Sequence, residues 1–422
     1  MCNSMRMGKG GAAALPLLVA TVVLVCSGAV TPGYAAEGKY TADFDRFWSQ
    51  IASDYPYFAT KATDWACVKA VYRPRAAATD NAREFIRILE RSLDELYDPH
   101  ASLNVNLPSS TRLIPTGLDL WAEWRDGRAI VTQVRPGSAA LHVGVRAGME
   151  VLSMNGVAID SAVQARLGQC QSRPDPAARD WALLAVLAGK HDTPRVIEIR
   201  SASGATAMRP DDAPIDIPRP PGVTSQRLEG NLGYIAIHDL GAGETVGLFD
   251  SALADLRHSA GLVLDLRDTA AGGSTNVAEP IMGRLISSEQ AYQRVQPRHR
   301  KAWVAKARPR GTWTYRAPVV VLVSRWTGSM GEGMAIGLDG MHRARIVGTA
   351  MAGLNGGVFT HHLPAIDVDY TVPGEALAHL DGTARERFRP GILVDLADPA
   401  IADDSDPILS AGIRVLQRQL SR

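Results

Sequence analysis

Residues 317–340, APVVVLVSRWTGSMGEGMAIGLDG, decide the fold that this sequence predicts. The valine-rich run 317–324 predicts a buried β-strand, and residues 331–341 predict a helix. Between the two, a glycine-lined turn carries Ser329. The N–H groups and dipole at the start of a helix stabilise negative charge, so Ser329 is a candidate nucleophile. The competing interpretation is that Ser329 only caps the helix.

Strand and helix patterns alternate on both sides of this turn. Strands are predicted at 232–240, 261–268 and 344–349, and helices at 245–258 and 275–287. Apolar strands that alternate with helices are typical of an α/β layer with mostly parallel strands.

Paired glycines follow the strand 261–268. In such a layer this loop lies at the carboxyl edge of the strands, where ligands bind. The backbone N–H groups of Gly272, Gly273 and Met330 are therefore candidate oxyanion donors. The alternative is a plain turn between a strand and a helix.

Two regions with different patterns of predicted secondary structure precede this layer. Residues 37–110 predict a helical N-terminal domain, because apolar residues recur there at helical spacing. Residues 111–205 predict short β-strands separated by Gly, Pro and Asn turns. The order of GLDL (117–120), VRPGSAA and GVRAGMEVLSMNGV resembles a PDZ domain.

A PDZ domain binds an extended peptide at a sheet edge. The resemblance implies that Gly117, Leu118 and Leu120 contact a peptide. The alternative is a domain that serves only for packing or as a lid.

The first residues resemble an export signal. A basic start and an apolar run (12–30) lead to a small-residue segment that ends near Ala35 or Ala36. This pattern predicts a signal peptide at 1–36 and a periplasmic or secreted protein. An uncleaved membrane anchor is the alternative, and a lipoprotein site at Cys26 is disfavoured by the bulky Val25 before it.

Composition excludes several classes of function. The 422 residues are 46% hydrophobic and 21% charged, with a net charge of +1 and no basic stripe of the kind that binds nucleic acid. No CxxC or HExxH metal motif is present, so neither a metal nor a cofactor is expected. Cys67 and Cys170 remain after signal removal, and the sequence leaves open whether they pair.

Five segments, taken in order, resemble the catalytic domain of the C-terminal processing (tail-specific) serine proteases. They are LGYIAIHDL, GLVLDLRDTAAGGST, APVVVLVSRWTGSMGEG, ARIVGTAMAGLNGG and LDGTARERFRPGILVDL. The resemblance covers nearly all of the mature chain. It implies a crotonase-like α/β catalytic domain at 225–422, after the helical and PDZ-like domains, and protein or peptide substrates.

One departure bears on the mechanism. Tail-specific proteases use a Ser-Lys dyad, but the lysine position of their GxxxxGKG segment is Leu354 here, and no lysine follows Ser329. The tricorn-like branch of the family uses Ser, His and Glu instead. The resemblance to that branch assigns its histidine to His100, in LYDPHASL, and its glutamate to Glu386, in DGTARERF.

This triad is chemically complete. Ser329 attacks a peptide carbonyl, His100 accepts and returns the proton, and Glu386 orients and stabilises the imidazole. The competing histidines are His238, His361, His362 and His379, and the competing carboxylates are Glu332, Asp98 and Asp268. A rival function is a catalytically inactive peptide- or ligand-binding protein, which the missing lysine motivates.

Overall fold

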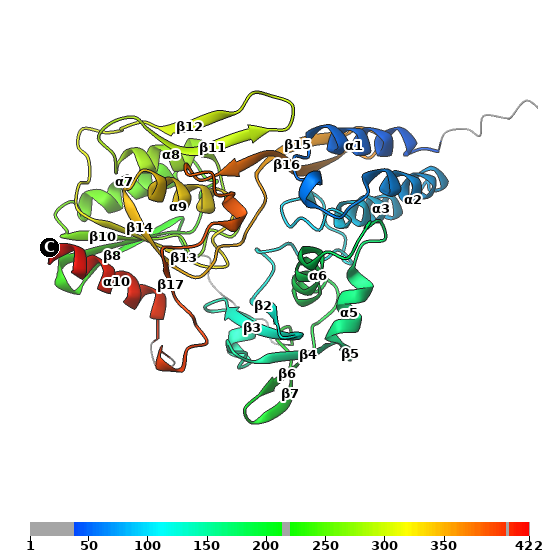
Figure 1. The fold of residues 1–422 in the computed structure, drawn as a ribbon, viewed down its shortest axis with the longest axis horizontal. Coiled ribbons are helices and arrows are strands. Elements are labelled where there is room, and N and C mark those ends of the chain that lie inside the picture. Colours follow the sequence, from blue (N-terminus) through cyan, green and yellow to red (C-terminus); the bar gives the residue numbers. More distant parts are fainter. Residues whose placement is uncertain (1–37, 213–219, 402–404, 422) are drawn as a thin grey trace, which may run out of the picture. The chain divides into compact units, whose positions relative to one another are not determined.

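The computed structural model describes residues 38–212, 220–401 and 405–421. The predicted signal peptide lies outside these residues. Three helices form the first part of this described chain. The helices are α1 (Thr41–Asp54), α2 (Trp65–Ala78) and α3 (Ala82–Asp94), with a 3-10 turn at Phe58–Thr60 (Figure 1). Asp64 and Asn81 cap α2 and α3 by accepting backbone N–H bonds. Tyr40 stacks on Phe85 with ring centroids 4.5 Å apart, so aromatic packing joins α1 to α3.

An antiparallel β-module follows, with strand order β2-β3-β4-β6-β7 and β5 paired to β4. Its elements are β2 (Leu120–Arg125), β3 (Arg128–Val134), α4 (Ala139–His142), β4 (Glu150–Met154), β5 (Val157–Ala158), α5 (Ile159–Arg166), α6 (Pro176–Ala188), β6 (Ile197–Ser201) and β7 (Gly204–Met208). Strands and short helices thus alternate over the range where the sequence predicts a β-rich domain. We call residues 117–208 the β-module.

An α/β layer forms the second half of the chain, as the sequence predicts. Its six-stranded sheet has the order β17-β14-β13-β10-β9-β8, and every neighbouring pair except β8–β9 is parallel. The strands are β8 (Val223–Leu228), β9 (Leu232–Ile237), β10 (Gly261–Asp265), β13 (Val319–Val323), β14 (Ala344–Gly348) and β17 (Ile392–Leu393). The helices are α7 (Thr245–Asp255), α8 (Thr275–Gly283), α9 (Met330–Gly340) and α10 (Pro407–Leu420), with 3-10 turns at Glu229–Asn231 and Pro399–Ile401.

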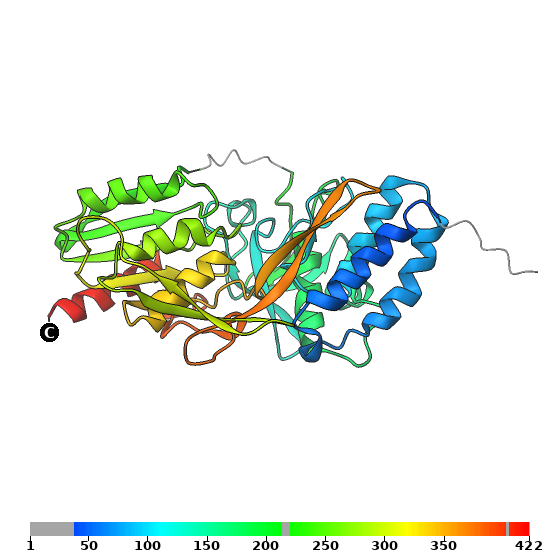
Figure 2. The same ribbon diagram turned by 90° about the horizontal axis from the view of Figure 1, so that it is seen from above.

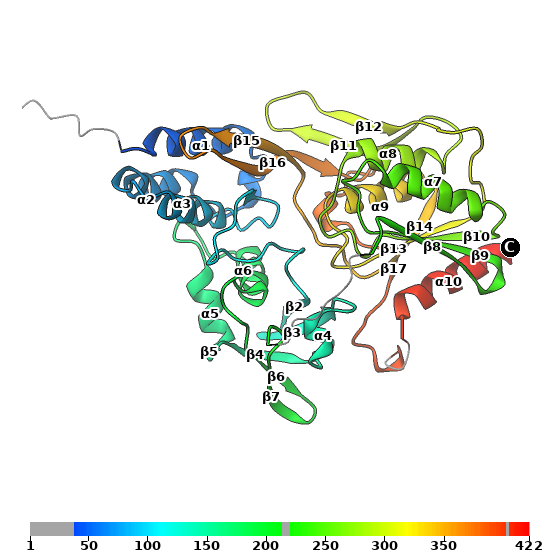
Figure 3. The ribbon, with the colours of Figure 1, turned by 180° about the vertical axis from the view of Figure 1, so that it is seen from behind.

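Helices cover both faces of this sheet, which explains the unbroken apolar run in β13. Val319, Val321 and Val323 belong to the core under α7, α8 and α9. Val320 and Leu322 pack with residues of α10 on the opposite face (Figure 3). Because successive side chains of a strand point to opposite faces, a strand buried on both sides must be apolar throughout.

A third sheet joins distant parts of the sequence, and the sequence did not predict it. It has the order β1-β16-β11-β12, with β15 also paired to β16 (Figure 2). The strands are β1 (Ser102–Leu103), β11 (Gln290–Pro297), β12 (Trp303–Ala307), β15 (Gly357–Leu363) and β16 (Val368–Ala378), and a 3-10 turn, η3, spans Arg385–Arg387. Ser102 pairs with Thr371, so the segment after His100 is fixed to β16, in the second half of the chain.

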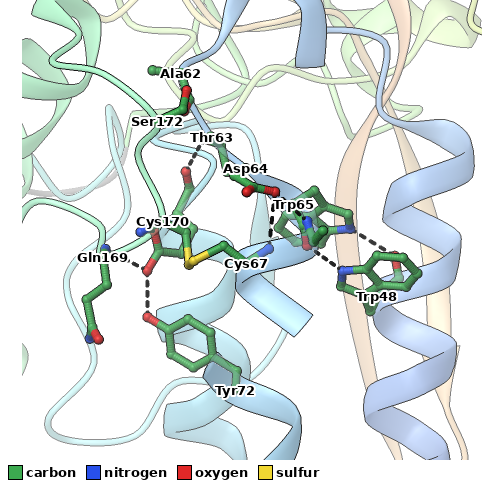
Figure 4. Close-up of a disulfide and its surroundings, with 12 residues drawn as sticks. Trp48, Ala62, Thr63, Asp64, Trp65, Cys67, Tyr72, Gln169, Cys170 and Ser172 are labelled. Carbon is green, nitrogen blue, oxygen red and sulfur yellow. Dashed lines mark hydrogen bonds between the residues drawn. A yellow bond between two sulfur atoms is a disulfide. The ribbon is translucent and has the colours of Figure 1, made fainter. Parts of the chain in front are cut away.

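A disulfide joins Cys67 of α2 to Cys170, in the segment after α5, which answers the question that the sequence left open (Figure 4). The backbone N–H groups of Gln169 and Cys170 also donate to the carboxylate of Glu95. The helical region and the β-module are therefore tied together covalently and by hydrogen bonds. Among the described residues, no helix has the length and apolarity that a membrane span requires.

Candidate active site

Ser329 lies at the start of α9 in a strained backbone conformation. Its φ is 49° and its ψ is −111°, values that non-glycine residues rarely adopt. A sharp turn of this kind, placed between a buried strand and a helix, presents the serine at the carboxyl edge of the sheet. Strain of order 1–3 kcal/mol at such a residue persists only where the surroundings hold it.

The double-glycine loop lies directly against Ser329. A Cβ atom added to Gly272 would come within 2.4 Å of Ser329 Cβ and 2.9 Å of its Oγ, so only glycine fits there. The N–H of Gly272 donates to Thr269 C=O at 2.9 Å, which commits it inside the turn. In the described chain, the N–H groups of Gly273 and Met330 have no such acceptor.

Glu332, the rival carboxylate, is wholly buried one turn along α9. It accepts hydrogen bonds from the N–H groups of Ser329 (2.8 Å), Gly353 (2.9 Å) and Leu354 (3.3 Å). Burial raises the pKa of Glu332 to about 7, against the opposing effect of Arg385 and these hydrogen bonds. The carboxylate therefore binds backbone groups and does not pair with a histidine.

Leu354 occupies the position that aligns with the lysine of the GxxxxGKG segment, and it borders the serine turn. Its Cδ1 would lie 3.4 Å from a Cβ built on Gly328. An apolar side chain thus occupies the space beside the nucleophile candidate, and it has no group that accepts a proton.

His100 is held by the residue that follows Leu354. Its Nδ1 lies 2.7 Å from the backbone O of Asn355. Because a carbonyl oxygen only accepts, Nδ1 carries the proton and Nε2 is left as the acceptor. Burial and, next, Arg385 lower the pKa of His100, so the ring is neutral at pH 7 and can act as a base.

Asp98 supports this arrangement, and the sequence had assigned it only as a competitor. Its carboxylate is buried and accepts from Tyr55 Oη (2.7 Å), Asn355 Nδ2 (2.8 Å) and the N–H of His100 (3.0 Å). It therefore holds the His100 backbone and the Asn355 side chain, on the two sides of the imidazole contact. The sequence signal was its position two residues before His100, in DPH.

Glu386 lies in η3, in the same neighbourhood but without a hydrogen bond to His100. Burial raises its pKa, and both Asp98 and Tyr57 interact with it electrostatically. Its Oε2 is buried and, among the described residues, has no partner. In this structure the Nδ1 position that a triad carboxylate would take is held by the Asn355 carbonyl.

The competing histidines are engaged elsewhere. Nδ1 of His238 lies 3.2 Å from Asp268, and Nδ1 of His362 lies 2.8 Å from Asp369. His361 faces Asp54, and His379 faces Asp339 and Asp381. Among the described residues, no group of three or more His, Cys, Asp or Glu side chains is placed to hold a metal ion.

The predicted peptide-binding loop of the β-module lies against the serine turn. Trp326 is 1% exposed, and its Nε1 donates to the backbone O of Leu118 at 2.7 Å. The N–H of Gly117 donates to Leu113 O, and Leu118 and Leu120 are buried. The sequence gave no signal for this contact, because Trp326 and the loop are about two hundred positions apart.

The chain matches two protein-family models. Residues 231–387 match peptidase family S41, and residues 37–94 match the tricorn protease C1 domain. The S41 match includes Ser329, Gly272, Gly273 and Glu386, while His100 lies between the two matched ranges.

Solved structures share the fold. Mature CPAF is 14% identical, with 90% of this chain and 96% of that chain covered and a TM-score of 0.59. The photosystem II D1 C-terminal processing protease is 18% identical, with 88% and 97% covered and a TM-score of 0.55. At these identities the likeness concerns the fold.

Proposed function

We propose, on the premise that this chain contains a peptidase family S41 domain, that it is an exported serine peptidase with Ser329 as nucleophile and His100 as general base. The observation that carries the proposal is a continuous path of contacts. The strained Ser329 turn bonds through Glu332 to residues 353 and 354, and Asn355 then binds His100. A Ser-Lys mechanism has no support here, because the lysine position is Leu354.

The proposed chemistry is acyl transfer. Ser329 Oγ attacks the carbonyl carbon of a peptide bond while His100 Nε2 takes the hydroxyl proton. The N–H groups of Gly273 and Met330 donate to the oxyanion that forms. His100 then protonates the leaving amine, and water, activated by the same nitrogen, hydrolyses the acyl-enzyme.

Glu386 is proposed as an electrostatic partner of the imidazole. When His100 becomes charged, a nearby carboxylate stabilises the positive ring without a direct bond. The unpartnered Oε2 of Glu386 is consistent with this role, since it remains available to a water molecule or to a reoriented imidazole. In the neutral state, the Asn355 carbonyl fixes the tautomer of His100 with its proton on Nδ1.

The substrates are proposed to be proteins or peptides, cleaved near their C-termini. The 117–120 loop is the proposed contact for an extended segment of the substrate. Export is supported by the predicted signal peptide and by the Cys67–Cys170 disulfide, because disulfides persist in oxidising compartments.

The test is labelling by a fluorophosphonate probe, which reacts with activated serines. We expect wild-type protein to be labelled, Ser329→Ala to lose all labelling and His100→Ala to be slowed by at least about 10²-fold. Ser251→Ala, an exposed serine of α7 in the same domain, is the control and should label normally. A folded wild-type protein that is never labelled would instead favour the inactive binding protein.

A further inference from the structure

The loop from Gly353 to Gly356, which we call the bridging loop, contacts His100 directly and is linked to Ser329 through Glu332. Its first two N–H groups donate to Glu332, and the carbonyl of Asn355 accepts from His100 Nδ1. One short loop is thus hydrogen-bonded to His100 at Asn355 and, through the Glu332 carboxylate, to the backbone of Ser329.

Glu332 fixes the bridging loop to the nucleophile. Its Oε2 accepts from both Ser329 N–H and Leu354 N–H, and its Oε1 accepts from Gly353 N–H. One wholly buried carboxylate therefore determines the position of the loop relative to the Ser329 backbone. A carboxylate is suited to this task because it offers only acceptors, whereas an amide would turn a donor toward one of the three N–H groups.

Arg385 holds the bridging loop from the other side. It is 3% exposed, and its Nη2 donates to Leu354 O (3.0 Å) and to Gly356 O (2.6 Å). These carbonyls flank Asn355, whose own carbonyl faces His100. Two bonds from one guanidinium fix the orientation of the peptide groups between them.

We propose that Glu332 and Arg385 are positioning residues that hold the bridging loop between Ser329 and His100, so that its backbone aligns nucleophile and base. This proposal rests on the proposed function. It assigns to Glu332 a role distinct from the carboxylate of a triad, since Glu332 does not touch the imidazole. It also assigns a role to two buried charged residues, Glu332 and Arg385, that are not among the three triad residues.

The ionisation of Glu332 makes the role measurable. Among the described residues, Arg385 and Arg325 are charged groups that act on Glu332 electrostatically. With a pKa of about 7, Glu332 gains a proton as the pH falls through neutrality, and a protonated carboxyl no longer accepts from all three N–H groups. Burial lowers the pKa of His100, so that ring titrates at a lower pH than an ordinary histidine. Two separate acid-side components are therefore expected.

The experiment compares fluorophosphonate labelling rates of wild type, Glu332→Gln and Arg385→Gln. We expect each substitution to slow labelling on the order of 10²-fold, since small misplacements of reacting groups cost about that much. The concentration of probe at half-maximal rate should change little, because neither side chain is proposed to contact the probe. Glu279→Gln is the matched control, as Glu279 also accepts a hydrogen bond, from Tyr292, but on α8. It should label like wild type.

The pH profile separates positioning from a general loss of structure. Wild-type labelling should show a component near pH 7 and another at lower pH, and Glu332→Gln should retain only the second. Labelling of Glu332→Gln at the wild-type rate would overturn the proposal, as would an unchanged component near pH 7. If Glu332→Gln does not fold, two other results would overturn the proposal. One is a pH profile of the wild-type protein that has no component near pH 7. The other is folded Arg385→Gln that is labelled as fast as wild type. A wild type that never labels defeats the proposed function instead.

Discussion

At the scale of single residues, the site depends on backbone conformations that side-chain chemistry alone does not reveal. Ser329 has a φ of 49°, and Gly272, with a φ of 71°, is close enough that any side chain would touch the serine. The sequence indicated the glycines as candidate donors. It did not indicate that the N–H of Gly272 donates to Thr269, which leaves Gly273 and Met330 as the proposed oxyanion donors.

Gly272→Ala should therefore impair the site. The new Cβ would collide with Ser329 Cβ, and we expect fluorophosphonate labelling to slow on the order of 10²-fold. Gly127→Ala is the matched control, because Gly127 has a φ of 76° but an added Cβ would meet nothing within 4 Å. Both variants bear similar backbone strain, so equal labelling rates would contradict the close approach.

At the scale of elements, short segments bring the site together. β1 has two residues, yet its pairing with β16 fixes the chain just after His100 to the half of the chain that carries Ser329. The segment after α5 is held to α2 by the disulfide and to Glu95 by two backbone bonds. None of these contacts follows from local sequence patterns, because each joins segments that are far apart along the chain.

Replacing both Cys67 and Cys170 by alanine should destabilise the protein. A crosslink across a sequence separation of 103 restricts the unfolded chain, and a loss of about 2–4 kcal/mol in the free energy of unfolding is expected. Urea unfolding, followed with and without reductant, measures it. The reductant should destabilise wild type and leave the double variant unchanged. Equal stability of the two oxidised proteins would contradict the prediction.

At the scale of the whole molecule, the β-module and the α/β layer share a core at the serine turn. Trp326 lies three residues before Ser329 but belongs to the apolar cluster of the β-module. Arg325 also reaches that module, where it pairs with Glu123. The turn that carries Ser329 is thus packed against the β-module as well as the α/β layer.

Trp326→Phe should lose about 1 kcal/mol of stability, the value of its bond to Leu118 O, and Trp326→Ala about 3–5 kcal/mol. Trp303→Ala is the control, because Trp303 is 51% exposed and its loss should change stability by less than about 0.5 kcal/mol. Thermal or urea unfolding gives the order of the three variants. A Trp326→Ala protein as stable as the Trp303→Ala protein would show that the shared core contributes little.

The sequence by itself determined the α/β layer, because a five-residue apolar strand such as β13 requires burial on both faces. It also determined the place of Ser329 between strand and helix, and the absence of a lysine at position 354. Only the tertiary structure decided the cysteine pairing, the third sheet, and the path from Ser329 through Glu332 and Asn355 to His100. Periodicity reports the faces of single elements, whereas contacts between segments hundreds of residues apart depend on how those elements pack.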